Sequence, residues 1–587
     1  MYNRIKCKYN IRILLHIVAV FVVVFLAACG TAATATPGAP ASPVATPTPI
    51  SADIFKPTAP AAPTTLPKPT AVPAQPATPA RDNIILVSSQ EPLSLDGWTT
   101  KCASNLIHFS CVDTGNEPFT WIDSKTYEVV PLSTVDKWEQ IEPARWRFAL
   151  RKGVKFHNGE EWNAETAKVN LDYNGDSANG LDSFSYSGAM SAQVVDPYTV
   201  DIVCKSACPI LARGMLFSKF QAPAWYKAAS PEERARKVIS LGPYKLVEWR
   251  SGIDIKFEAN KDYLPSKAFD AQAPNIKTFT QVWRGEALVR SAMLRSGEGD
   301  WAEDIGFENQ TQVPVAKASG TTEVFAGIFD TMWHPELKKQ KVRLALIHAV
   351  DCEAIAKALY KGVVPCLGSI SVKGTVGITD RNSKPREYNP TLAKQLLKEA
   401  GYDPANKVNI YVQANRVFKD VEFMEAVARY WKEAGVTTEF FALELARYTD
   451  IRSSGCGKFT NVAGYKEALD CAARVPPAPL STTSHVYTTA TSNEILDMST
   501  QGNRRLGCFN INSRACYADL QKKIDIASAA PVGPERARLL TEVADIAYDE
   551  AYFIPFFHNQ MVYGLGKNVD WEPLYSPRLR VNTMKFK

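Results

Sequence analysis

Twelve cysteines give this chain its most regular spacing of residues that could do chemistry. Cys7 and Cys29 stand near the N-terminus. The other ten form five sequential pairs: Cys102 and Cys111, Cys204 and Cys208, Cys352 and Cys366, Cys456 and Cys471, and Cys508 and Cys516. In an oxidising compartment such an even set predicts disulfide bonds, because short separations make encounter frequent. Buried free thiols are the alternative. A zinc site is disfavoured, since neither a C-x2-C pair nor a histidine cluster is present.

Motifs for other chemistries are absent or incomplete. The sequence has no G-x-S-x-G nucleophile turn, no H-E-x-x-H zinc helix and no prominent pair of carboxylates. Ser453–Lys458 resembles a phosphate loop, but Arg452 stands where the first glycine is needed and Phe459 where Ser or Thr is needed. We therefore expect no enzyme, no catalytic residue, no metal and no cofactor. An exported hydrolase is the disfavoured alternative.

Two residues that invite a functional interpretation have simpler structural ones. His157 stands beside Asn158 and Gly159, so we expect it to flank a turn. Arg343 lies within an apolar helical pattern, and we expect a packed or ion-paired guanidinium there.

The N-terminus predicts export. Four basic residues precede an apolar run at Ile13–Phe25 that is interrupted by His16, which is the layout of a secretory signal. Leu26-Ala-Ala-Cys29 resembles a bacterial lipobox, in which Cys29 receives the lipid and residues 1–28 are removed. An uncleaved anchor would need about 18 or more apolar residues. We expect an extracytoplasmic protein that is lipid-anchored to the cell membrane through Cys29.

Charge gives no reason to expect a nucleic-acid partner. The formal net charge is +6, and the four basic residues of the signal account for most of it, which leaves about +2 on the mature chain.

A Pro-, Ala- and Thr-rich stretch at 29–82 follows the lipidation site and predicts a disordered linker. The body beyond it mixes both kinds of secondary structure, which indicates an α/β fold with parallel pairing. The expected strands are Ile84–Val87, Tyr198–Val203 and Val408–Val412, and the expected helices Val342–Tyr360, Leu392–Ala400, Asp420–Ala434 and Arg536–Tyr548.

Five blocks in order resemble the extracellular solute-binding proteins of family 5, the large binding components of ABC importers for peptides, nickel complexes and related solutes. They are Trp146–Gly159 with Asn163–Ala167, Leu241–Trp249 with Asn260–Tyr263, Val342–Asp351 with Glu353–Ile355, Tyr388–Pro390 with Ala393–Gly401, and the terminal helix leading to Ile554-Pro555.

The resemblance implies a two-lobed, periplasmic-binding-protein-like fold of type II (large cluster), with hinge strands between the lobes and an extra domain on lobe I. By that pattern residues 83–113, 186–275 and 548–587 form lobe I, residues 114–185 the extra domain, and residues 276–547 lobe II.

The same resemblance implies that a solute is captured between the lobes and handed by a monomer to ABC permease subunits with a cytoplasmic ATPase. Candidate contacts are Trp98, Thr99, Thr100, Lys101, Trp121, Trp333, Tyr465 and Asp470. Asp470 stands where peptide carriers of the family have an acidic Asp-Pro element, but Cys471 replaces the proline. This departure counts against peptide specificity. The family resemblance as a whole still favours a peptide or peptide-like solute, with sugars and metallophores, or signalling to a receptor, as alternatives.

Overall fold

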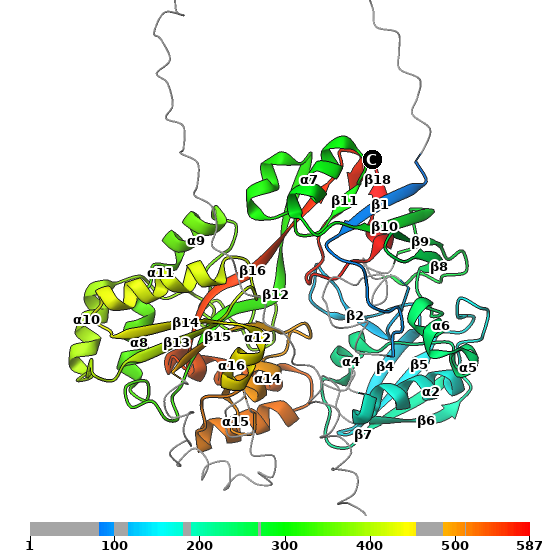
Figure 1. Ribbon diagram of the computed structural model, residues 1–587. Helices are drawn as coiled ribbons and strands as arrows, with labels where there is room; N and C mark the ends of the chain where they lie inside the picture. Colours follow the sequence, from blue (N-terminus) through cyan, green and yellow to red (C-terminus); the bar gives the residue numbers. More distant parts are fainter. Residues whose placement is uncertain (1–80, 99–114, 180–189, 268–271, 453–484, 511) are drawn as a thin grey trace, which may run out of the picture. The chain divides into compact units, whose positions relative to one another are not determined.

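Ten strands form the largest sheet of the computed structural model (Figure 1), which describes residues 81–98, 115–179, 190–267, 272–452, 485–510 and 512–587. Their order across the sheet is β14-β13-β15-β12-β16-β11-β1-β10-β9-β8. In chain order they are β1 (Asn83–Ser88), β8 (Tyr244–Arg250), β9 (Asp254–Ala259), β10 (Thr278–Trp283), β11 (Trp301–Ala302), β12 (Val315–Phe329), β13 (Val408–Gln413), β14 (Thr438–Leu443), β15 (Val486–Ser492) and β16 (Phe553–Leu565). β1 runs parallel to β10 and β11, and β13 runs parallel to β14 and β15.

Strands β12 and β16 connect the two halves of this sheet. They pair antiparallel along almost their whole length and run side by side in Figure 1. β15 pairs only with the Glu323–Phe329 end of β12, whereas β11 pairs only with the Gly564–Leu565 end of β16. β12 and β16 therefore form one long two-stranded ribbon, with β15 attached at one end and β11 at the other. This is the arrangement expected of hinge strands.

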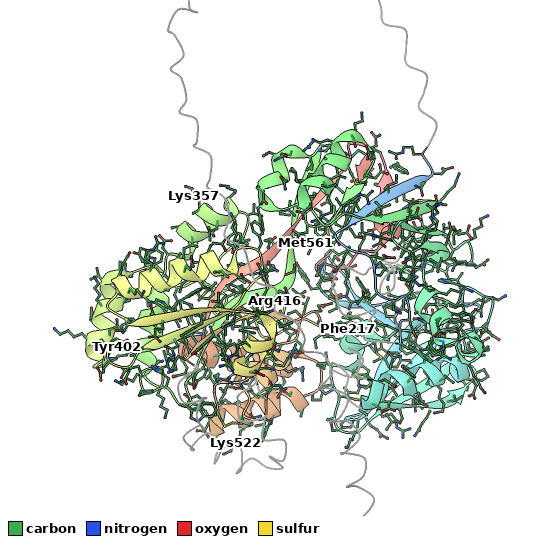
Figure 2. All side chains as sticks on the ribbon, in the orientation of Figure 1. Phe217, Lys357, Tyr402, Arg416, Lys522 and Met561 are labelled. Atoms are coloured by element: carbon green, nitrogen blue, oxygen red, sulfur yellow. A yellow bond between two sulfur atoms is a disulfide. The ribbon has the colours of Figure 1, made fainter. Side chains whose placement is uncertain are left out.

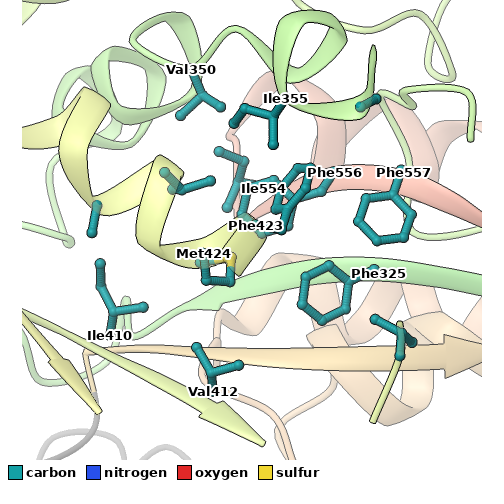
Figure 3. Packing of buried hydrophobic residues seen from close by; sticks show 14 of the residues in the cluster. Phe325, Val350, Ile355, Ile410, Val412, Phe423, Met424, Ile554, Phe556 and Phe557 are labelled. Atoms are coloured by element: carbon teal, nitrogen blue, oxygen red, sulfur yellow. The ribbon is translucent and has the colours of Figure 1, made fainter. Parts of the chain in front are cut away.

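The core on one face of the sheet is built from helix α11 (Asp420–Glu433) and the two long strands. Phe423 and Met424 of α11 pack with Ile410 of β13 and with Phe556 and Phe557 of β16 (Figure 3). These side chains are fully or almost fully buried. Burying each side chain of this size contributes about 1.5–3 kcal/mol.

The remaining helices surround the sheets. They are α2 (Ala164–Gly175), α4 (Leu211–Gly214), α5 (Pro223–Ala228), α6 (Pro231–Arg236), α7 (Ala287–Ser296), α8 (Gln340–His348), α9 (Cys352–Tyr360), α10 (Pro390–Glu399), α12 (Leu445–Arg452), α14 (Met498–Gln501), α15 (Ala518–Ala529) and α16 (Pro534–Asp549), with short 3-10 turns η2 (Ser177–Asn179), η3 (Met215–Phe217), η5 (Phe307–Gln312) and η9 (Val581–Thr583) and a π-helical turn η8 (Gly502–Leu506).

One expected helix is wrong. The apolar pattern of Val342–Tyr360 predicts a single helix, but the structure divides it into α8 and α9. Asp351 starts the second helix, because its carboxylate accepts the backbone N–H of Ala354 at 2.9 Å. An N-cap of this kind is worth about 1 kcal/mol and favours a break over a continuous helix.

A second sheet has four strands in the order β4-β5-β7-β6 and is covered by α2. The strands are β4 (Val135–Glu142), β5 (Arg145–Leu150), β6 (Met190–Asp196) and β7 (Thr199–Cys204). Phe148, Trp162 and Phe220 form part of its core. Two-stranded pairs complete the structure: β2 (Thr120–Ile122) with β3 (Val129–Pro131), and β17 (Val569–Asp570) with β18 (Lys585–Phe586).

Among the described residues three disulfide bonds are formed, all between cysteines that the sequence pairs. They join Cys204 to Cys208, Cys352 to Cys366, and Cys508 to Cys516. The expected pairs Cys102–Cys111 and Cys456–Cys471 fall outside the described residues, as does Cys29.

The sheets cross the expected domain boundaries. The four-stranded sheet takes β4 and β5 from one side of residue 185 and β6 and β7 from the other. β10 and β11 lie within 276–547 but pair with β1. The boundaries themselves stay a prediction. Within the part of the chain that the structure describes, no helix has both the length and the apolar character needed to cross a bilayer.

Candidate functional site

Three parallel strands end at one edge of the large sheet. β13, β14 and β15 run in the same direction, so Gln413, Leu443 and Ser492 mark a common carboxyl edge. In α/β sheets, ligands bind outside this edge, because the loops that leave the strands converge there. The candidate site therefore centres on the loop after β15, residues 493–497, which we call the 494 loop.

A buried ion pair holds the far end of the 494 loop. Arg536, near the start of α16, donates from Nη2 to Asp497 Oδ1 at 2.9 Å and from Nε to Oδ2 at 3.1 Å. Both side chains are only 2% exposed. Nη1 of Arg536 donates to carbonyls at the end of α15, those of Ala527, Ser528 and Ala530, and Nη2 also donates to Ser499 Oγ. The bidentate geometry satisfies both charges and fixes the loop.

The near end of the loop is fixed by an amide. Asn493 is fully buried, and its side-chain Nδ2 donates to Asp497 O at 3.1 Å and to Ser371 Oγ at 3.3 Å. Its backbone N–H donates to the carbonyl oxygen of Thr322 in β12. With both ends held, the conformation of Glu494 and Ile495 between them is constrained.

Residues from distant parts of the chain meet the 494 loop. Arg578 donates from Nε to Glu494 Oε2 at 2.9 Å, and the two side chains are 8% and 6% exposed. The Tyr575 hydroxyl donates to Glu494 O at 3.1 Å, and Arg213 of α4 donates to Ile495 O at 2.9 Å. The carboxyl edge of the parallel strands therefore contacts both α4 and the C-terminal segment through polar bonds.

Aromatic rings surround the guanidinium of Arg578. It lies 4.7 Å from the ring of Phe217, which Figure 2 labels, and 5.6 Å from the ring of Trp121. Arg580, two residues on, lies 5.3 Å from the same Trp121 ring. Cation–π contacts of this kind are worth about 0.5–2 kcal/mol when partly desolvated. The ring of Trp121 thus contacts both guanidinium groups, and the ring of Phe217 contacts that of Arg578.

Trp121 is the only one of the expected ligand contacts that the structure places here, among those it describes. It is fully buried and packs edge-on against Tyr575. Arg578 and Arg580 both lie against its ring, so Trp121 packs against the cationic side of the contact with Glu494.

Trp98 lies elsewhere and serves packing. Its ring stacks on Tyr173 of α2 at 4.1 Å and tilts against Tyr226 of α5 at 4.4 Å. Its indole N–H donates to Lys219 O at 3.0 Å. Burial raises the pKa of the nearby Asp96, which accepts the Tyr226 hydroxyl. Trp98 therefore ties the segment after β1 to α2 and α5.

Trp333 also lies apart from Trp121. It follows β12, is half-buried and packs with Met332 and Cys516. Its backbone N–H donates to Asp330 Oδ1 at 3.0 Å. Burial raises the pKa of Asp330 to about 6, with Arg514 as the main opposing charge. The other expected contacts, Thr99, Thr100, Lys101, Tyr465 and Asp470, lie outside the described residues.

Histidines in the structure have structural roles. His157 is hydrogen-bonded through Nε2 to Gly242 O at 3.0 Å, and burial lowers its pKa to about 4. Burial likewise lowers the pKa of His485 to about 3, while its Nδ1 accepts the Asn409 N–H. No group of three metal-ligating side chains occurs in the described part of the chain. Arg343 is also structural, as predicted: it donates to the carbonyls of Leu337, Lys338, Glu550 and Ala551.

Sequence reasoning missed Glu494, Arg578 and Arg213. The run Val486–Ser492 is rich in β-branched residues and is followed, after Asn493, by the acid Glu494, a signal that could have identified the strand and its carboxyl end. Nothing local in the sequence could have paired Glu494 with Arg578, because 84 positions separate them.

Comparisons with known proteins bear on the family and the fold of the chain. The family model described as "Bacterial extracellular solute-binding proteins, family 5 Middle" matches residues 128–465. Among curated proteins, the glutathione-binding protein GsiB of Escherichia coli K12 is 29% identical over 268 residues, which is 43% of this chain and 49% of that protein. The GsiB of Shigella boydii is 28% identical over the same shares. The match thus spans about half the length of these relatives.

Solved structures match over nearly their whole length. HbpA2 from Haemophilus parasuis has a TM-score of 0.71 and 20% identity, covering 86% of this chain and all of that one. DppA from Helicobacter pylori, in complex with the peptide STSA, has a TM-score of 0.62 and 16% identity, covering 86% and 98%. They show that the fold is the two-lobed type II fold of periplasmic binding proteins. Because the family model matches more than half of its residues, the chain belongs to the bacterial extracellular solute-binding proteins of family 5.

Proposed function

We propose that this protein captures a peptide or peptide-like solute between its two lobes and delivers it to the permease of an ABC importer. Family membership supports solute binding as the activity. Two relatives support the solute class, since one is a glutathione-binding protein and another was solved with a bound peptide. Export and lipid attachment through Cys29 place the protein outside the cytoplasm, next to a membrane partner.

The contact between Glu494 and Arg578 carries the proposal. It sets a carboxylate at the edge of the parallel strands against a guanidinium of the C-terminal segment, with both side chains more than nine-tenths buried. Taking these charges out of water is costly unless each keeps a partner of opposite sign. The ammonium group of a peptide can take the place of Arg578 on Glu494, so exchange of one cation for another leaves the carboxylate paired.

This exchange favours solutes that carry an ammonium group. A neutral sugar offers no cation to Glu494. It therefore cannot replace Arg578 as the ionic partner of this carboxylate. Peptides and glutathione both have the required group. Asp470 remains a second predicted acid for the same role.

Thermal unfolding of the purified full-length protein tests the proposal. Glutathione, short peptides, sugars and metallophores are added separately, and glutathione or peptides are expected to raise the melting temperature. A solute at about 100 times its Kd stabilises by about 2.7 kcal/mol. Glu494→Gln is expected to weaken peptide binding about tenfold or more, because it removes a charged hydrogen-bond acceptor.

Glu425→Gln is the matched control, since Glu425 is an exposed acid on α11. It should leave the affinity unchanged. Stabilisation by sugars alone, or Glu494→Gln binding peptides at the wild-type affinity, would contradict the proposal.

The membrane protein that binds the solute-loaded protein distinguishes import from sensing. We expect permease subunits to co-purify with the protein from membranes in the presence of the solute. Co-purification of a signalling receptor in their place would contradict import. Palmitate labelling that is lost in Cys29→Ser would test the anchor independently.

A further inference from the structure

Arg505 has a buried guanidinium that lacks an acidic partner. It lies in η8, is 6% exposed, and forms no ion pair with any acid of the described residues. Nε donates to Thr491 Oγ1 at 3.4 Å and Nη2 donates to Thr489 Oγ1 at 3.0 Å. Nη1 is buried without any hydrogen-bond partner. Arg536, which is also buried, has its carboxylate partner in Asp497.

Two further cations lie around the same place. Arg452 lies 5.9 Å from the ring of Tyr448, and Arg514 lies 5.3 Å from the ring of Tyr487. The positive charges of Arg452, Arg505 and Arg514 all act on the Tyr448 hydroxyl. Asp330 is an acid of the described residues that acts on Arg514. Three guanidinium groups thus lie close enough to the Tyr448 hydroxyl to act on it.

The location of Arg505 connects it with the candidate site. Thr489 and Thr491 are in the last four residues of β15, immediately before the 494 loop. Arg505 therefore lies beside the carboxyl end of the same strand that leads to Glu494. The π-helical turn that presents it is a rare conformation, which occurs mostly where a side chain must be placed for a purpose.

Its neighbours are suited to an anion. The Thr491 hydroxyl donates to Gln501 Oε1 at 2.8 Å and accepts from Arg505. The Thr489 hydroxyl accepts from Arg505, which leaves its own proton to donate. The free Nη1 of Arg505 and this hydroxyl are two donors with no acid between them. A carboxylate accepts such donors and is the group that guanidinium binds best.

We propose that Arg505 holds a carboxylate of the bound solute, so that the site selects solutes that carry a free acid as well as an ammonium group. The inference rests on the proposed solute binding and narrows it. Glu494 binds the ammonium group of the solute and Arg505 binds its carboxylate, both at the carboxyl edge of the parallel strands. An isolated buried cation is costly to the empty protein and becomes favourable when the anion arrives.

Two probes test the site, the anionic group alone and a peptide. In the first experiment, acetate is compared with chloride at equal ionic strength in thermal unfolding of the full-length protein. Acetate is expected to raise the melting temperature of the wild type. In the second, trialanine and trialanine amide are compared by calorimetric titration, and the free acid is expected to bind about tenfold more tightly or better.

Arg505→Gln and Arg504→Gln form a matched pair. Arg504 is exposed and adjacent, so both variants lose one positive charge in the same turn. Arg505→Gln is expected to lose the response to acetate and to bind trialanine and its amide equally. Arg504→Gln should behave as the wild type in both experiments.

The stability of the empty protein supplies a readout that a structural role would not give. Because Arg505→Gln removes an unpaired buried charge, the variant is expected to unfold at the same temperature as the wild type or above it. Arg505→Lys keeps the charge without the planar fork and should keep part of the acetate response.

The inference is overturned if acetate stabilises Arg505→Gln as it does the wild type, if the wild type shows no acetate effect, or if Arg505→Gln still prefers the free acid. If acetate acts through Arg505 but no peptide binds, the carboxylate site at Arg505 is supported and the proposed peptide binding is contradicted. The carboxylate site and peptide binding are therefore contradicted by different results.

Discussion

Glu117 and Arg580 lie 463 positions apart in the sequence, and their side chains form an ion pair of 2.8 Å in which neither is exposed to solvent. Glu117 also accepts the Tyr263 hydroxyl at 2.7 Å and the Ser133 N–H at 3.1 Å. Burial raises the pKa of Tyr263, so its hydroxyl stays protonated and donates. The C-terminal segment that carries Arg578 to Glu494 is therefore anchored by a second, fully buried charge.

Arg580→Met should destabilise the protein strongly. It leaves the Glu117 carboxylate buried without its cation, which costs about 3–5 kcal/mol. Denaturant unfolding of the full-length protein measures this. Lys585→Met is the control, because the Lys585 side chain is 62% exposed in its pair with Asp570, and such pairs contribute about 0–1 kcal/mol. Equal effects of the two variants would contradict the role of the buried pair.

Stability should depend on pH through Glu303, which follows β11 and is 2% exposed. Burial raises the pKa of its carboxyl to about 7, although the Ser89 N–H donates to it. Between the unfolded pKa of about 4.5 and this value, the folded state binds more protons than the unfolded state. The contribution is therefore fully present below about pH 4.5 and is lost as pH rises through 7.

Glu303→Gln removes this dependence. Relative to the wild type, its free energy of unfolding should increase by about 3 kcal/mol between pH 4.5 and pH 8. Unfolding curves of both proteins at each pH measure the difference. The exposed Glu298→Gln should follow the wild type. A constant difference between Glu303→Gln and the wild type across this range would show that the carboxyl is ionised throughout.

Local structure was largely predictable from the sequence, and its long-range arrangement was not. Helices α10 and α11 end where glycines permit a left-handed backbone, at Gly401 (φ +57°) and Gly435 (φ +99°). Such endings depend on neighbours in the chain. The pairing of β12 with β16 depends on strands more than 200 positions apart, which no local pattern encodes.

The candidate site shows the same division. Trp121 was named as a candidate ligand contact from its position in the family pattern; it lies beside the contact of Glu494 with Arg578, and its contact with a solute stays a prediction. Glu494 and Arg578 gain their significance only from meeting each other, and Arg505 only from lacking an acidic partner among the described residues. Burial and pairing are properties of the folded chain, so residue types and spacing could not reveal them.

Thiol counting tests the disulfides. Apart from Cys7 and the proposed lipidation site Cys29, the chain has ten cysteines, and six of these form the three bonds among the described residues. Under denaturing conditions without reductant, close to zero free thiols are expected. Cys352→Ala with Cys366→Ala should cost about 3 kcal/mol, because the bond closes a loop of 14 residues. Six or more free thiols would contradict the bonds.

Arg536 should position the 494 loop as well as stabilise the fold. Its pair with Asp497 fixes the end of the loop that presents Glu494, so Arg536→Met is expected to lower stability by about 3–5 kcal/mol. It should also weaken glutathione or peptide binding several-fold, measured well below the melting temperature. Arg538→Met is the control: it lies on the same helix, its side chain is 60% exposed, and neither quantity should change by more than about 1 kcal/mol. If Arg536→Met loses stability but binds with the wild-type affinity, the pair supports the core without placing Glu494. If it loses both, the orientation of the loop is part of solute recognition, because Arg536 itself makes no contact with the Glu494 carboxylate in the described structure.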